Sequence, residues 1–118
     1  MSTRHAEELD GPPGIRQLAP TELEAMLDSG SPPVLVDVRT PEERALARID
    51  GARLFDREGH DYVLSLQRDT PIACYCHHGI RSQAAAEYLR QHGFRMLYNL
   101  QGGIDQWSIH VDPSVPRY

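Results

Sequence analysis

The sequence contains no lysine, so every fixed positive charge belongs to an arginine. Twelve arginines face seventeen aspartates and glutamates, which leaves a formal net charge of −5 at pH 7. Proteins that bind nucleic acid in general neutralise phosphates with clustered lysine and arginine. This acidic balance argues against nucleic acid as a partner.

Long apolar runs are also missing. No stretch approaches the roughly 20 apolar residues of a membrane-spanning helix, and the opening MSTRHAEELDGPPG lacks the apolar centre of a signal peptide. Cysteine is scarce: Cys74 and Cys76 lie too close for an unstrained bridge within a strand and are too few for a closed structural zinc site. We expect free thiols in the cytoplasm and no membrane partner.

A single domain accounts for most of the chain. With 118 residues, 40% of them hydrophobic and 25% charged, the composition is that of a globular protein with one core. Residues 1–14 combine charges, glycines and a Pro-Pro pair without apolar periodicity, and residues 111–118 contain two prolines. We expect a flexible leader at 1–14, a folded domain at 15–110 and a C-terminal tail at 111–118.

Short apolar segments alternate with helical patterns along the domain. The predicted strands cover residues 15–18, 34–38, 52–55, 72–76 and 96–100. A helix is predicted after each of them: one from Pro20 that ends before Gly30, a short one from Pro41, and others near 62–67, 82–92 and 104–107. This alternation predicts an α/β fold with a mainly parallel sheet and helices on both faces. Ligands bind such sheets beyond the carboxyl ends of the strands, which directs attention to Asp37, Arg39 and Cys76.

Cys76 stands between a buried strand and a helix in the segment Cys-His-His-Gly-Ile-Arg-Ser. The backbone N–H groups of residues 77–82 are expected to converge on its sulfur as an anion-binding nest. The helix N-terminus and Arg81 should lower the pKa of this thiol. Gly79 permits the tight turn, and Ser82 is expected to cap the helix.

The order of motifs around this loop resembles the rhodanese family from about residue 15 to Trp107. The matching segments are Asp37-Val38-Arg39-Thr40-Pro41-Glu42-Glu43, Gly51-Ala52, the cysteine loop itself and Gly102-Gly103-Ile104-Asp105-Gln106-Trp107. The resemblance implies a five-stranded parallel sheet whose cysteine strand neighbours the Asp-x-Arg strand. Asp37 and Arg39 would then orient the loop by hydrogen bonds and ion pairing. Residues 47–52 lack the family's histidine, and the loop lacks the lysine of classical thiosulfate-specific enzymes.

The resemblance also implies a sulfurtransferase that carries sulfur as a persulfide on Cys76. A small anionic donor such as thiosulfate would supply the sulfur, and cyanide, a small thiol, a protein thiol or a sulfur-relay protein would accept it. No metal or organic cofactor is expected. The substrate would be bound by the rest of the loop, His77, His78, Gly79, Ile80, Arg81 and Ser82.

Several assignments stay open at the level of sequence. Cys74 fits core packing better than a resolving thiol, and His77 and His78 fit substrate contacts and solvent-facing positions equally well. A cysteine phosphatase or arsenate reductase would use a similar cradle, but it places seven residues from Cys to Arg, whereas Cys76 to Arg81 counts six. A non-catalytic docking module of the same fold usually lacks the cysteine.

Overall fold

A computed structural model describes residues 14–118, so the predicted leader lies outside the described residues except for Gly14. Five strands form one sheet in the order β1-β5-β4-β2-β3, and every neighbouring pair is parallel. The strands are β1 (Ile15–Leu18), β2 (Val34–Asp37), β3 (Arg53–Leu54), β4 (Ile72–Tyr75) and β5 (Leu97–Leu100). The helices are α2 (Pro20–Leu27), α3 (Pro41–Leu46), α4 (Arg57–Leu64), α5 (Ile80–Gln91) and α6 (Gly103–His110). The predicted fold class and the adjacency of β2 and β4 are confirmed.

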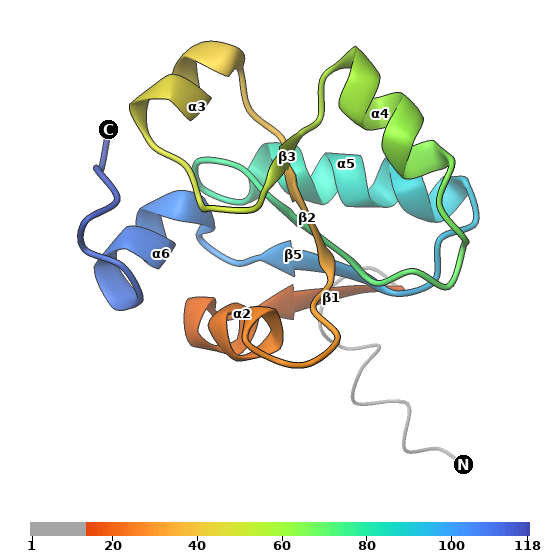
Figure 1. Cartoon of the computed structure of the whole chain (residues 1–118), viewed down its shortest axis with the longest axis horizontal. Helices are drawn as coiled ribbons and strands as arrows, with labels where there is room; N and C mark the ends of the chain where they lie inside the picture. Colours follow the sequence, from red (N-terminus) through yellow and green to blue (C-terminus); the bar gives the residue numbers. More distant parts are fainter. Residues whose placement is uncertain (1–13) are drawn as a thin grey trace.

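Helices cover both faces of the sheet, and each face has its own core. Helices α4 and α5 lie on one face and α2 and α6 on the other (Figure 1). Val63 and Leu89 pack with Cys74 on the first face, whereas Trp107 packs with Tyr75 on the second. Within residues 14–118, no helix is long and apolar enough to span a bilayer.

Two helices begin earlier than their apolar patterns predicted. Helix α5 begins at Ile80, because Gly79 adopts a left-handed backbone with φ of 99° and forms the N-cap. Helix α4 begins at Arg57, because the Asp56 side chain accepts a hydrogen bond from the Gly59 amide at 2.9 Å. The early start of α5 places its N-terminus only a few residues after Cys76.

Residues 111–118 pack against the domain, although their prolines suggested only a tail. Val115 is buried in the same core as Trp107, and its carbonyl accepts a hydrogen bond of 2.5 Å from the Ser108 hydroxyl. Tyr118 reaches the carboxyl edge of the sheet, where it stacks on His77 with ring centroids 3.9 Å apart. The chain therefore returns to the loop that follows β4.

Candidate active site

Cys76 directly follows β4 and points its sulfur toward the start of α5. Its Sγ accepts hydrogen bonds from the amide of Gly79 at 3.1 Å and the amide of Ser82 at 3.3 Å, and the Ser82 hydroxyl lies 3.4 Å away. Only 1% of the residue's surface is exposed. The loop therefore surrounds one sulfur atom with donors, as an anion-binding nest does.

These donors decide the protonation of the thiol. Burial alone would raise the pKa of Cys76, but hydrogen bonds from Ser82, through its hydroxyl and its amide, act in the opposite direction. The amides of Gly79 and His78 add to this effect, and the net result is a pKa below that of an ordinary thiol. The Cys76 thiol therefore ionises more readily than an ordinary thiol.

Ser82 does not cap α5, so the expectation from sequence was wrong on this point. It lies inside the first turn and is fully buried, and its hydroxyl shares its single proton between the Asn99 side-chain oxygen on β5, at 2.5 Å, and the Cys76 sulfur, at 3.4 Å. Asn99 in turn donates to the Gly79 carbonyl at 3.1 Å. The side chain of Asn99 therefore holds both ends of the turn next to the cysteine.

The start of α6 supports the loop from another side. The amides of Ile104 and Asp105 donate to the carbonyls of Cys76 and His77, at 2.9 Å and 3.2 Å. Gly103 lies so close that a Cβ there would overlap both carbonyl oxygens, and its φ of 64° is left-handed. Gly103 is therefore required for the close approach of α6 to the loop.

The Arg81 guanidinium is engaged by a carboxylate and does not bond to the Cys76 sulfur. It donates to Glu43 Oε1 at 2.7 Å and to Oε2 at 2.9 Å, and 45% of its side chain is exposed. These hydrogen bonds from Arg81 hold the pKa of Glu43 far below its usual range, against the opposing effect of burial. Glu43, in the first turn of α3, therefore connects this helix to the start of α5.

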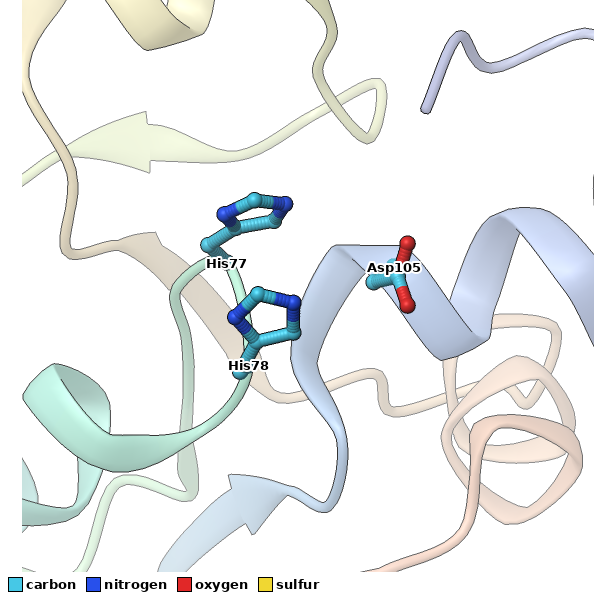
Figure 2. A group of neighbouring side chains, drawn as sticks. All are labelled: His77, His78 and Asp105. Atoms are coloured by element: carbon cyan, nitrogen blue, oxygen red, sulfur yellow. The ribbon is translucent and has the colours of Figure 1, made fainter. Parts of the chain in front are cut away.

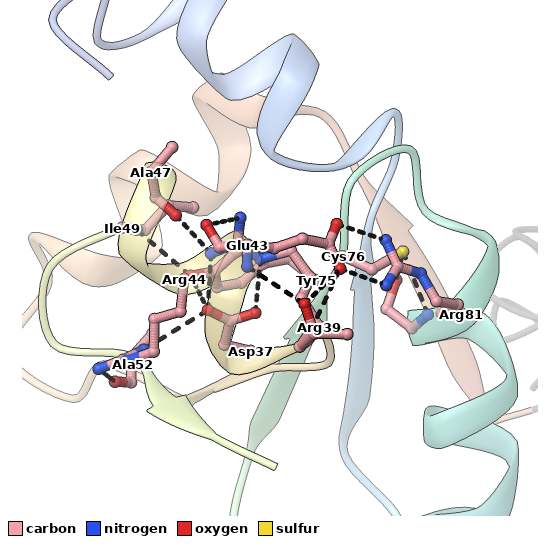
Figure 3. A network of polar contacts seen from close by, with 12 residues as sticks. Asp37, Arg39, Glu43, Arg44, Ala47, Ile49, Ala52, Tyr75, Cys76 and Arg81 are labelled. Atoms are coloured by element: carbon pink, nitrogen blue, oxygen red, sulfur yellow. Dashed lines mark hydrogen bonds and ion pairs between the residues drawn. The ribbon is translucent and has the colours of Figure 1, made fainter. Parts of the chain in front are cut away.

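Asp37 and Arg39 form a buried ion pair beside Tyr75, the residue that precedes Cys76. Arg39 donates to both carboxylate oxygens, at 2.7 Å and 2.8 Å, and the Tyr75 hydroxyl donates to Oδ2 at 3.0 Å (Figure 3). Arg39 also donates to the Ala47 carbonyl at 2.6 Å. The pair therefore joins β2 and β4 to the segment that follows α3.

Tyr118 connects this buried pair with the loop. Its hydroxyl accepts a hydrogen bond from Arg39 at 3.0 Å and donates one to Glu43 at 2.8 Å. A continuous line of polar contacts thus runs from Asp37 through Arg39, Tyr118 and Glu43 to Arg81, and Figure 3 shows most of its members. No local pattern in the sequence pointed to Tyr118 or Asn99, since both act through residues that are distant along the chain.

The other loop residues face outward to different degrees. Ile80 is 79% exposed at the first position of α5, and His78 is exposed. The His77 ring is stacked between His78 and Tyr118, with centroids 3.9 Å from each. Cys74 is fully buried among apolar side chains, and burial raises its pKa to about 12, so it lies in the core as an un-ionised thiol.

Comparison with known proteins agrees with this geometry. A family model described as Rhodanese-like domain matches residues 19–110. The chain belongs to the rhodanese family. The Asp-x-Arg strand neighbours the cysteine strand, as the resemblance implied.

Named relatives lie within the same family. The chain is 36% identical over 94 residues to the Thiosulfate sulfurtransferase GlpE of Ectopseudomonas mendocina (strain ymp), which covers 79% of this chain and 84% of that protein. It is 36% identical over 101 residues to the protein of the same name from Stutzerimonas stutzeri (strain A1501). This match covers 85% of this chain and 90% of that protein. A crystal structure of a rhodanese-like domain protein from Staphylococcus aureus superposes with a TM-score of 0.69 at 29% identity, covering 86% of this chain and 97% of that chain.

Proposed function

We propose that this rhodanese is a sulfurtransferase that accepts the outer sulfur of an anionic donor on Cys76 and passes it to a thiophilic acceptor. The observation that carries the proposal is the set of hydrogen bonds from Gly79 and Ser82 to the Cys76 sulfur. Such donors stabilise a thiolate before reaction and a persulfide after it. Relatives named thiosulfate sulfurtransferase make thiosulfate the donor to test first.

The chemistry balances without a metal, an organic cofactor or an external oxidant. The Cys76 thiolate attacks the outer sulfur of thiosulfate, a new S–S bond forms, and the old S–S bond breaks with its electron pair leaving on sulfite. Cyanide or a thiolate then attacks the outer sulfur of the persulfide and releases the Cys76 thiolate. Cyanide yields thiocyanate, and a thiol yields a new persulfide.

The burial of Cys76 determines which sulfur atom the acceptor can reach. With 1% of the residue exposed, the sulfur of the thiol itself is shielded, and an acceptor must meet the outer sulfur of the persulfide. Beside the loop stands Ile80, 79% exposed and apolar. These features support a small thiol or a protein thiol as the acceptor, or a sulfur-relay protein.

The remaining loop residues contribute to binding in different ways. Gly79 and Ser82 hold the reacting sulfur, while Arg81 is held by Glu43 at the rim of the loop and contributes positive charge there. Asp37 and Arg39 act at a distance, through Tyr118 and Glu43, and are positioning residues.

Intact-protein mass spectrometry after thiosulfate treatment tests the proposal directly. The native chain is expected to gain one sulfur atom that reductant removes, and to produce thiocyanate when cyanide is added. Cys76→Ser should do neither, whereas Cys74→Ala should do both, because Cys74 lies in the core away from the loop. A sulfur adduct that persists in Cys76→Ser would overturn the proposal.

The same preparations distinguish the two alternatives. Turnover of a phosphate ester or arsenate without any sulfur adduct would indicate the phosphatase or arsenate reductase chemistry. Absence of turnover with thiosulfate, phosphate esters and arsenate, together with an unreactive Cys76, would favour a docking module.

A further inference from the structure

A second group of side chains converges immediately beyond Cys76. His77 and His78 come from the loop after β4, and Asp105 comes from the first turn of α6. Figure 2 shows the two imidazole rings and the carboxylate turned toward a common space. One nitrogen or oxygen atom of each residue lies within 4.8 Å of one such atom in each of the other two. The Asp105 amide also donates to the His77 carbonyl at 3.2 Å, which ties the two segments together.

His77 carries an unsatisfied nitrogen. Among residues 14–118, its Nε2 is one of two buried side-chain nitrogen or oxygen atoms without a hydrogen-bond partner. The ring is stacked between His78 and Tyr118, so it is not free to turn toward another partner. A buried polar atom without a partner is costly and calls for an explanation. A bound cation would supply the missing partner.

Asp105 is available to such a cation. Its present partner is Arg117, which donates to Oδ1 at 2.8 Å and to Oδ2 at 3.3 Å. The Arg117 side chain is 57% exposed, and exposed ion pairs contribute little net stability. A divalent ion can therefore displace Arg117 from the carboxylate at small cost.

We propose that His77, His78 and Asp105 bind a divalent late-transition-metal ion, for which Zn²⁺ is the probe that fits best. Two imidazoles and one carboxylate are ligands that suit Zn²⁺, whereas Mg²⁺ and Ca²⁺ prefer oxygen ligands. Ligand atoms around tetrahedral zinc lie about 3.4 Å apart, so groups within 4.8 Å of one another need to approach by up to about 1.4 Å, which rotations of the His78 and Asp105 side chains provide. Three protein ligands leave a fourth position open to water or an anion.

The site is separate from the sulfur chemistry. Cys76 Sγ is held by Gly79 and Ser82 and is not one of the three converging ligands. Metal binding must therefore survive the loss of the thiol. This independence separates a failure of the metal site from a failure of the proposed sulfur transfer.

The experiment is a Zn²⁺ titration of tag-free full-length protein, followed by calorimetry or by competition with a chromogenic chelator. Cys76→Ser serves as the background, so that a thiolate cannot account for binding; Cys74 stays un-ionised in the core. We expect one Zn²⁺ per chain and no comparable binding of Mg²⁺. In this background, His77→Ala, His78→Ala and Asp105→Asn should each weaken binding by about tenfold or more, while the surface control His92→Ala should not.

Arg117→Ala provides a variant whose affinity should rise. Removing the competing guanidinium should tighten Zn²⁺ binding by up to about fivefold, and damage to folding cannot produce that result. The proposal is overturned if the Cys76→Ser protein shows no saturable binding, or if binding persists unchanged when His77, His78 and Asp105 are each replaced.

Discussion

Glu43 and Arg81 stand 38 positions apart in the sequence, yet they form a two-pronged ion pair that fastens α3 to the first turn of α5. The pair ends the line of polar contacts that begins at the buried Asp37 and Arg39. The orientation of the cysteine loop therefore depends on a helix that contributes no atom to the cradle around the sulfur. This dependence can be measured.

Replacing Glu43 with glutamine should lower the free energy of unfolding by about 1 kcal/mol. The amide keeps one acceptor for Arg81 but loses the charge, and solvent screens the pair because Arg81 is 45% exposed, so a larger loss is not expected. Glu42→Gln is the matched control, since Glu42 lies in the same helix turn and is exposed. Urea denaturation measures both, and an equal loss in the two variants would contradict the special role of Glu43.

The difference in stability between the native chain and Glu43→Gln should depend on pH. The folded state holds the pKa of Glu43 below its value of about 4.3 in the unfolded chain, mainly through hydrogen bonds from Arg81. A lowered pKa contributes stability that is fully present above the unfolded pKa and is lost as pH falls. We expect a constant difference above about pH 5 that shrinks below about pH 4. A stability difference that grows on acidification would show that folding raises the pKa of Glu43 instead of lowering it.

Ser82→Ala should raise the pKa of Cys76, because the hydroxyl contributes to holding it low against the effect of burial. The rate of iodoacetamide alkylation at Cys76, followed by peptide mass spectrometry across pH, reports this shift. Sulfur loading from thiosulfate at neutral pH should slow in parallel, since less thiolate is present. Ser65→Ala, at an exposed serine whose hydroxyl donates to the Tyr62 carbonyl, should leave the alkylation profile unchanged.

Gly103→Ala should abolish sulfur transfer and destabilise the fold by about 2 kcal/mol or more. Its added Cβ would overlap the carbonyl oxygens of Cys76 and His77 in a left-handed backbone. Gly51→Ala is the matched control: its φ of 86° is also left-handed, but a Cβ there meets no atom within 4 Å. That control should cost about 1 kcal/mol and retain transfer. Equal activity in the two variants would show that the approach of α6 to the loop does not matter.

Local sequence was sufficient to predict the strands of the buried sheet. The runs Val34-Leu35-Val36 and Ile72–Tyr75 are apolar, and both are flanked by residues that interrupt regular structure, so their type and order could be predicted. Helix starts were less well predicted. The start of α5 depends on the left-handed Gly79, and the start of α4 on the Asp56 cap, and an apolar pattern reports neither.

Tyr88 illustrates the limit of residue type as a guide to burial. An aromatic ring is typical of a core position, but 36% of the Tyr88 surface is exposed and its hydroxyl bonds to His60 at 2.7 Å on the surface. Trp107, another aromatic residue, is buried between α6 and the sheet. A helical side chain is buried when it lies on the helix face that packs against the sheet. Tertiary packing determines which face that is.

The sequence by itself determined the α/β order and indicated Cys76 as the candidate nucleophile, because strand periodicity and the turn from Cys76 into α5 are encoded by neighbouring residues. Only the tertiary structure decided the partners: Glu43 for Arg81, Asn99 for Ser82, Tyr118 for Arg39, and Asp105 beside His77 and His78. Parallel strands bring their carboxyl ends to one edge, where segments far apart in the chain meet. Hydrogen bonds and ion pairs across that edge depend on distances in space, which spacing along the chain does not encode.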